Sequence, residues 1–571
     1  MPRKRWGNDI AGDRNLPAKE AEYVVAFRLD RDKLRHRLAV FSDYDRLVLG
    51  LNLVHDRKTM RLKSTRWHLL HVEPPNHYGH CTMVIFSFST HLLLSRLDFQ
   101  SFAIRNMLRL QTLRTEMRPT LRLALPLVLA EIGWMTMGIV DTVMVGHLPD
   151  SANAIGAVSI SSSIFNVLAF FGGGLLIGLD TLVAQAFGAG KREDCHRSLV
   201  NGIYLSIVMT PFLMAPVWFF GPLLQSLHID PSVSRLAFPY MKALAIGLFP
   251  LMLYFAVRRC IQAMDMVRPV AFSLVTANLI NLLFNWVLIY GKWGFRAMGV
   301  VGSGWSTALA RLYMALVLVG YLVWYDRRHR TELLKTPVNI DFTRIRRLII
   351  LGLPAATQIT LEISVFALTA ALIGRLGAVP LAAHQIALNT VAFTYMVPLG
   401  ISSAAAVRVG QAIGRKDPSG AADAGGTAIF IGALFMGLCS VALLVFPRPI
   451  ARMYTPDEAV IHTTILLLAA GAAFQLFDGL QTVATGALRG AGDTRTPMLC
   501  HFTGYWVIGL PLGAWLCFRR GWGAFGLWAG LSLALILIGI VLLFAWRRTV
   551  RRLTQTPIQN TLPVNSPVGS V

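Results

Sequence analysis

The stretch LVAQAFGAGK at residues 182–191 returns as VRVGQAIGRK at residues 407–416, with the matching glutamine and glycine 226 residues later. Each copy carries a glutamine, a glycine three residues on and then a basic residue, with Gln185 and Gly188 in the first copy and Gln411 and Gly414 in the second. A second pair of segments, MDMVRP at 264–269 and GDTRTP at 492–497, repeats at an offset of 228 residues. Chance similarity between glycine-rich helix ends is the alternative, but the nearly equal offsets favour a chain built from two related halves.

The composition is that of a membrane protein. The chain has 571 residues, of which 54% are hydrophobic and 15% charged, whereas soluble domains carry roughly 25% charged residues. From Leu121 onward, apolar runs of at least ~18 residues recur, which is the length that crosses a hydrocarbon core of ~30 Å. We therefore expect an all-α membrane protein with twelve transmembrane helices, near residues 121–145, 155–182, 199–223, 237–258, 269–290, 299–325, 348–374, 380–407, 424–446, 461–487, 498–518 and 524–546.

The basic residues predict how these helices are oriented. The net charge of +24 would suggest nucleic-acid binding in a soluble protein, but here the bases cluster in short connections, such as Arg258-Arg259 and Arg489, and in the 326–347 connection. The positive-inside bias then places both termini and the 326–347 linker in the cytoplasm, with the chain in the inner (plasma) membrane and no nucleic-acid partner. Since six is an even number, bundles 118–325 and 348–550 run in the same direction, which predicts a pseudo-two-fold axis along the membrane normal.

The two ends of the chain lie outside the predicted bundles. Residues 1–117 are rich in Arg, His and Asp and contain no sustained apolar run. We interpret them as an extension that is disordered or that results from a start codon assigned too early; a small cytoplasmic domain is the alternative. Residues 551–571 are expected to form a cytoplasmic tail. The six cysteines are scattered without ligand spacing, so neither a disulfide framework nor a zinc site is expected.

Carboxylates within the predicted helices are the candidate functional groups. Asp at membrane depth costs at least ~2.5 kcal/mol on insertion scales, so such a residue is a functional candidate by default. Glu362 and Asp478 lie near the middle of their helices, with Gln358 one turn before Glu362 and Gln475 close to Asp478. A polar stripe in an apolar helix faces a wet interior, because lipid cannot satisfy it. The alternative is that these carboxyls bond neighbouring helices and hold the bundle together.

Several segments resemble a known family in their order and spacing. They are ALP at 124–126, VDTVMVG at 140–146, LDTLVAQAFGAG at 179–190, GLP at 352–354, AAHQIALN at 382–389 and GALRGAGDTR at 486–495. On these segments, residues 118–550 resemble the multidrug and toxic compound extrusion (MATE) transporters, most closely the bacterial NorM-like branch. Residues 1–117 lie outside the resemblance.

The resemblance implies roles for particular residues. Glu362 and Asp478 match the positions at which NorM-like transporters bind the coupling cation or proton. Asp141 matches the family's site in the first bundle, where related members add polar residues that correspond here to Asn281 and Asn285. Some members have a second acid where this chain has Asn285, which would weaken a sodium site by one charge. Ser303 and Thr307 could supply further oxygens. Glu131 lies ten residues before Asp141 and could line the same cavity, whereas Asp180 is near the cytoplasmic end of its helix, where it could be functional or simply solvated.

Aromatic and methionine side chains are candidates for the substrate cavity. Flat cations are held by apolar and cation–π contacts, although lipid contact or packing is the more ordinary role of such residues in membrane helices. The candidates are Met135, Met137, Tyr254, Phe366, Tyr395, Met396 and Phe474.

The function predicted from these features is secondary active antiport, in which a monomer embedded in membrane lipid exports cationic amphiphilic drugs or metabolites. The exchanged ion would be Na⁺ or H⁺, without a cofactor and without a metal beyond Na⁺. A flippase for lipid-linked oligosaccharides is one alternative, but it would need many Arg and Lys residues inside the helices, where we expect acids instead. A membrane-embedded enzyme, the alternative from another class, would need an Asp-rich metal motif that the sequence does not contain.

Overall fold

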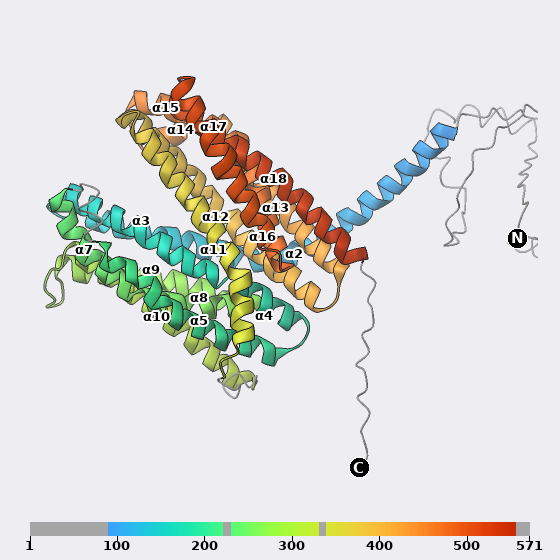
Figure 1. The fold of residues 1–571 in the computed structure, drawn as a ribbon, viewed down its shortest axis with the longest axis horizontal. Helices are drawn as coiled ribbons and strands as arrows, with labels where there is room; N and C mark the ends of the chain where they lie inside the picture. The colour runs from blue at the N-terminus through green and yellow to red at the C-terminus, as the bar shows by residue number, and fades with distance from the viewer. Residues whose placement is uncertain (1–89, 221–229, 331–338, 556–571) are drawn as a thin grey trace, which may run out of the picture. The chain divides into compact units, whose positions relative to one another are not determined.

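The structure is a computed structural model that describes residues 90–220, 230–330 and 339–555. By its internal contacts the chain divides into residues 1–105 and 106–571, and only the start of the first helix is described in the former. The elements are α2 (Thr90–Val145), α3 (Ser151–Leu175), α4 (Gly178–Gly188), α5 (Arg192–Trp218), α7 (Pro231–Ile246), α8 (Leu248–Ala263), α9 (Arg268–Tyr290), α10 (Val300–His329), α11 (Phe342–Gly374), α12 (Ala378–Gly414), α13 (Pro418–Val445), α14 (Pro447–Arg452), α15 (Glu458–Gly490), α16 (Arg495–His501), η4 (Phe502–Gly509), α17 (Leu510–Ala514), η5 (Trp515–Arg519) and α18 (Gly523–Gln555) (Figure 1).

The helices agree with the predicted membrane spans in place and type. Among the described residues, ten helices are long and apolar enough to cross a membrane, and the pair α7 and α8, bent by 41°, makes an eleventh. The predicted span at 498–518 corresponds to the helical path from α16 to η5, in which η4 and η5 are π-helical. The first helix begins at Thr90 and not near Leu121, so residues 90–117 are helical. Residues 1–89 and 556–571 lie outside the described residues, so the interpretation of both ends stays a prediction.

Two hydrophobic cores divide the helices into two lobes. The first lobe, α2 to α10, surrounds a core that includes Phe165, Leu244 and Tyr254, and the second lobe, α11 to α18, surrounds a core that includes Tyr505 and Leu535. The helix α2 contributes to both. Leu123, Ala124 and Leu127 belong to the second core, whereas Ala130, Met137 and Val145 belong to the first. The helix α11 likewise places Leu348 and Ala356 in the first core, so the predicted division into two bundles describes the fold, with α2 and α11 contributing to both cores.

The repeated sequence motifs meet at the interface between the lobes. A methyl group added to Gly188 would lie 2.1 Å from the Gln411 carbonyl oxygen, and one added to Gly414 would lie 2.1 Å from the Gln185 carbonyl oxygen. The side chain of Gln185 donates to the Gly490 carbonyl at 3.1 Å. Contacts that are reciprocal between equivalent surfaces are those that a two-fold axis produces. The two copies of the motif are therefore the contact surfaces of the two halves.

The residues just before the second repeated segment add to this interface. In the first lobe the carbonyl of Ala263, at the end of α8, accepts from the Gln411 side chain at 2.9 Å, as Gly490 at the end of α15 accepts from Gln185. Thr181 also donates to the Arg489 carbonyl at 2.7 Å. These contacts lie at the helix ends that are followed by Lys191 and Lys416. We call this side of the protein the basic end. The sequence predicts that it faces the cytoplasm. The lobes are thus closed against each other at the basic end.

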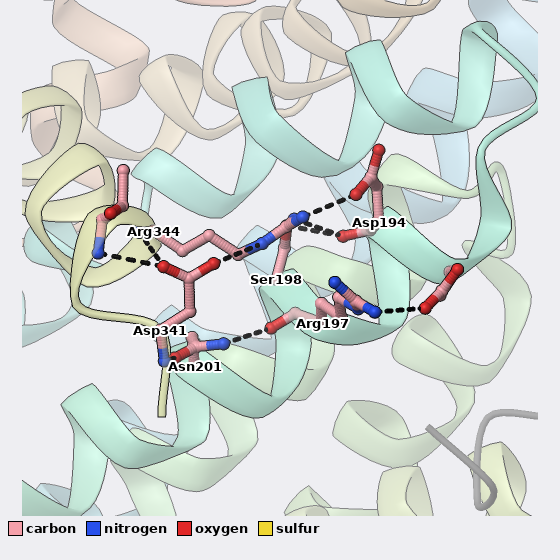
Figure 2. A network of polar contacts seen from close by, with 8 residues as sticks. Asp194, Arg197, Ser198, Asn201, Asp341 and Arg344 are labelled. Atoms are coloured by element: carbon pink, nitrogen blue, oxygen red, sulfur yellow. Dashed lines mark hydrogen bonds and ion pairs between the residues drawn. The ribbon is translucent and has the colours of Figure 1, made fainter. Parts of the chain in front are cut away.

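A polar network ties the start of the second lobe to α5 (Figure 2). The guanidinium of Arg344 donates to the Asp194 carboxylate at 2.5 Å and to the Ser198 hydroxyl at 3.2 Å. The backbone N–H of Asp341 donates to Asn201 at 2.8 Å. Asp341 in turn caps α11 by accepting from the backbone N–H groups of residues 343 and 344. The predicted linker 326–347 is shorter than expected, because α10 continues to His329 and α11 begins at Phe342.

Candidate functional site

A cavity of about 460 Å³ lies between the two lobes. Helices α2, α3 and α8 of the first lobe and α11, α12, α15, α16 and α18 of the second line it. Its wall is largely apolar and aromatic, as in sites that hold flat organic ligands. The aromatic rings that line it include Trp134, Phe170, Phe255, Phe366, Phe474 and Trp528.

The two carboxylates predicted for ion coupling both line this cavity. Glu362 on α11 keeps 16% of its side chain exposed, and Asp478 on α15 is buried. Asp478 accepts from Gln481 at 3.0 Å and forms no ion pair within the described part of the chain. Among the described residues neither acid is paired with an arginine, so both carboxylates can attract a cation or a proton.

His501 is a residue of the candidate site that the sequence reasoning missed. Its Nδ1 lies 3.7 Å from Glu362 Oε2, and its Nε2 lies 3.5 Å from the Gln358 side-chain nitrogen. Gln358 lines the cavity beside it, as the polar stripe predicted. The sequence contained a feature that could have identified it, because a histidine in the predicted span 498–518 is an ionisable group within a membrane helix.

The predicted substrate residues divide into two groups. Phe366, Tyr395, Met396 and Phe474 line the cavity. Met135, Met137 and Tyr254 do not, so their assignment to the cavity wall was wrong. Met137 and Tyr254 are instead buried in the first core. The faces of α2 and α8 that line the cavity carry other residues, namely Glu131 and Trp134 on α2 and Phe255 and Arg258 on α8.

Gln475 also lies away from the cavity. It is fully buried and donates to the Thr394 hydroxyl at 2.5 Å and to Met436 Sδ at 3.6 Å. Its neighbours on α15, Phe474 and Asp478, are the ones that line the cavity. The bond to Thr394 joins α15 to α12, so the structure places Gln475 as a contact between helices.

Asp141 forms a separate polar cluster inside the first lobe. Its Oδ1 accepts from Asn281 at 3.0 Å and from Asn285 at 2.7 Å, and its Oδ2 accepts from Thr307 at 2.7 Å. All four side chains are buried. The grouping predicted from the family is therefore present. In this arrangement the amides donate to the carboxylate, so a bound Na⁺ would require their oxygens to turn toward it. Ser303 is buried with an unpartnered hydroxyl and does not bond to Asp141.

A basic residue, Arg311, lies near this cluster. Arg311 follows Thr307 by one turn of α10, is buried, and interacts electrostatically with Asp141. It donates to the Leu244 carbonyl at 3.4 Å and lies 4.3 Å from the centre of the Phe165 ring. A resident guanidinium of this kind opposes the binding of a second cation at Asp141.

Five charged side chains gather where the lobes meet. Arg258 bonds to Glu131, Arg259 lies 3.2 Å from Asp180, and Arg489 lies 3.8 Å from the same Asp180 oxygen. All three arginines line the cavity, and so does Glu131. Glu131 and Asp180 are thus partners of arginines, and only Glu131 reaches the cavity wall.

This cluster corrects two predictions. Arg258, Arg259 and Arg489 were interpreted as bases of connecting loops, and the spans as holding acids but no bases. The structure places Arg258 and Arg259 inside α8 and Arg489 in the last turn of α15. Arg258 is only 3% exposed. Acids from other helices pair with these arginines, and such pairs cannot be found from positions along the chain.

The comparisons with known proteins agree with this fold and identify the family. The family model MatE matches residues 126–287 and 354–515, one match in each lobe. A probable multidrug resistance protein NorM of Bradyrhizobium diazoefficiens is 34% identical over 445 residues, which are 77% of this chain and 95% of that protein. Among solved structures, the eukaryotic MATE transporter AtDTX14 matches with a TM-score of 0.70 at 21% identity, covering 77% of this chain and 99% of that one. A multidrug resistance MATE transporter in an outward-facing conformation matches with a TM-score of 0.68 at 18% identity, covering 78% and 98%.

Proposed function

Because this chain belongs to the MATE family of membrane transporters, and is not an enzyme, we propose that it is a secondary active multidrug exporter. It would bind cationic amphiphilic compounds in the cavity between the lobes and release them in exchange for Na⁺ or H⁺. The name of the NorM relative supports drug export. The observation that carries the proposal is the position of Glu362 and Asp478 on the wall of an otherwise apolar, aromatic cavity.

The chemistry of the cavity explains how exchange would be enforced. A cationic substrate and a coupling ion both neutralise Glu362 and Asp478, so the binding of one disfavours the binding of the other. The aromatic walls hold the apolar body of the substrate. A closed basic end and a cavity between two lobes suit alternating access, in which one lobe rocks against the other. We propose that the protein lies in the inner membrane. Its basic end would face the cytoplasm.

The buried arginines raise the second candidate, a flippase for lipid-linked oligosaccharides. Such a substrate carries a pyrophosphate with at least two negative charges. The cavity cluster offers three guanidinium groups, but Glu131 and Asp180 neutralise two of them. One surplus positive charge does not match a pyrophosphate, so drug export remains the function that we propose.

Everted membrane vesicles provide the test. We expect Glu362→Gln and Asp478→Asn each to abolish export of a fluorescent cationic dye, because each removes one of the two cavity carboxylates that do not pair with an arginine. Glu458→Gln is the matched control, since Glu458 begins the same helix as Asp478 but is exposed and pairs with Arg448 and Arg452. Membrane levels of each variant are measured by immunoblot. Undiminished export in both cavity variants would refute the assignment.

The same vesicles identify the coupling ion. A Na⁺ gradient at fixed pH and a pH gradient without Na⁺ are applied in turn, and dye export is followed in each. Export under only one of the two gradients assigns the ion. Export that depends on neither gradient would contradict antiport.

A further inference from the structure

The interior of the first lobe holds a guanidinium with few hydrogen bonds. Arg311 on α10 is 5% exposed, and among the described residues its side chain donates to the Leu244 carbonyl alone, at 3.4 Å. Its Nε is buried without a partner, and its guanidinium carbon lies 4.3 Å from the centre of the Phe165 ring. An arginine can donate five hydrogen bonds. These neutral contacts therefore hold the side chain in place but leave its charge to be balanced elsewhere.

Asp141 is the acid that balances this charge. Of the other buried acids and arginines in the described part of the first lobe, Asp180 and Arg258 belong to the ion pairs beside the cavity. Asp326 is also buried, but it lies about 22 Å farther along α10, at 1.5 Å for each residue. Arg311 interacts electrostatically with Asp141. Since buried charges are normally paired, the two form a pair of opposite charges inside the lobe.

The helix α10 brings the two charges into one region. The Thr307 hydroxyl donates to Asp141 Oδ2 at 2.7 Å. Arg311 follows Thr307 by one turn of the same helix, and residues four apart lie on one helix face. The carboxylate of Asp141 therefore has a hydroxyl and a guanidinium on the same side.

The oxygen atoms that a Na⁺ ion would need are present around Asp141. Besides the carboxylate and the Thr307 hydroxyl, Asn285 has an amide oxygen that is buried without a partner. The hydroxyl of Ser303, one turn before Thr307 on α10, is also buried and unpartnered. Carboxylate and carbonyl oxygens are the ligands of hard cations. The ligand types therefore suit Na⁺, and the obstacle to its binding is the charge already present.

We infer that Arg311 is a built-in counter-ion that takes the place of a cation at Asp141, so that Na⁺ is excluded from the first lobe. The inference rests on the proposed exchange function, and it leaves Glu362 and Asp478 in the second lobe as the groups that bind the exchanged ion. A unit charge about 10 Å away, acting through an effective dielectric constant of about 20, weakens the binding of another cation by roughly tenfold or more. Arg311 therefore determines ion specificity, and its removal should uncover a Na⁺ site.

Binding of ²²Na⁺ to the purified full-length protein in detergent tests the inference. Every variant carries Glu362→Gln and Asp478→Asn, which remove the acids of the second lobe and leave Asp141 as the site to be measured. We expect this background to bind no ²²Na⁺ at Asp141. Adding Arg311→Met, which keeps an unbranched side chain without its charge, should create a site for about one Na⁺ per protein, with affinity roughly tenfold or more above the background. Adding Asp141→Asn as well should abolish that site.

Two further variants separate the effect of charge from that of folding. Arg311→Lys keeps the positive charge and should bind no more ²²Na⁺ than the background. Arg375→Met removes an exposed arginine just after α11 and should give the same result. Thermal unfolding of each variant is followed in Na⁺ and in choline. Na⁺ should raise the unfolding midpoint of Arg311→Met alone, because a ligand that binds only the folded state stabilises it.

The outcomes decide between a counter-ion and an ordinary packing residue. A gain of ²²Na⁺ binding that appears in Arg311→Met, depends on Asp141 and is absent from Arg311→Lys supports the inference. A folded Arg311→Met variant without this gain overturns it. Binding of ²²Na⁺ that depends on Asp141 while Arg311 is in place overturns it as well, and this comparison decides the question if Arg311→Met does not fold.

The exchange function is tested separately. Dye export by wild-type protein that depends on neither a Na⁺ nor a pH gradient would refute antiport. The ²²Na⁺ measurements do not involve transport, so they would still show whether Arg311 excludes Na⁺ from Asp141.

Discussion

Replacing Gly414 by alanine should loosen the closed basic end of the transporter. The added methyl carbon would lie 2.1 Å from the Gln185 carbonyl oxygen and 2.9 Å from the Ala189 nitrogen. Both are backbone atoms, so no side chain can turn aside. Ordinary contact begins at 3.4 Å, and the two helix ends must therefore separate by about 1.3 Å, the difference between the two distances.

The added methyl group costs free energy only in the conformation in which the lobes are closed at this end. Overpacking of a close contact costs about 1–3 kcal/mol, and the cost disappears in a conformation where α4 and α12 have moved apart. The ratio of closed to open conformations should then fall by about 5- to 150-fold. Since transport requires both conformations, dye export should fall as well. Gly188→Ala should have the same effect, because its methyl group meets the Gln411 carbonyl oxygen at 2.1 Å.

Pulsed electron paramagnetic resonance measures the change directly. Spin labels at Lys191→Cys and Lys416→Cys, both exposed and both just beyond the repeated motifs, report the distance between the lobes in a background without other cysteines. We expect Gly414→Ala to shift the distribution to longer distances. Gly426→Ala is the control, because it adds a methyl group to an exposed helical glycine with nothing within 4 Å. An unchanged distribution and undiminished export in Gly414→Ala would refute the reasoning.

Two further predictions concern individual polar contacts. Thr307→Val removes the 2.7 Å bond to Asp141, and loss of a bond to a charged group costs about 1.5–3 kcal/mol, so the thermal unfolding midpoint in detergent should fall. Thr142→Val is its control, because the exposed Thr142 hydroxyl bonds only to a carbonyl of its own helix, and an equal drop in both would contradict the role of Asp141. The backbone N–H of Arg344 lowers the pKa of Asp341, with smaller contributions from Thr343 and the Arg344 guanidinium. A carboxylate with a lowered pKa stabilises the folded state above its ordinary pKa near ~4 and loses that contribution as the pH falls through the folded-state value. Wild-type protein should therefore lose more thermal stability than Asp341→Asn between about pH 5 and pH 3, and parallel curves for the two would contradict this.

Several features followed from the sequence because they depend on local pattern. Apolar runs long enough to cross a bilayer specify helices wherever they occur, and ten of the expected spans are present as such, with an eleventh bent between α7 and α8. The repeated motifs at 182–191 and 407–416 indicated two halves, and Glu362 and Asp478 were found because an acid at membrane depth is rare. None of these inferences required knowledge of which helices touch.

The tertiary structure decided which side chains share a site. Met137 and Tyr254 fitted the residue types of a drug cavity, but the rotation of α2 and α8 buries both in the first core. Arg258, Arg259 and Arg489 looked like loop bases until acids on α2 and α4 were seen to pair with them. His501 meets Glu362 only because α16 lies beside α11. The sequence by itself determined the helices, their repeat and their unusual charges, because these are set by local composition. Only the packing of helices far apart in the chain decided that the repeated motifs contact each other. The same packing decided that Glu362 and Asp478 line one cavity with three arginines.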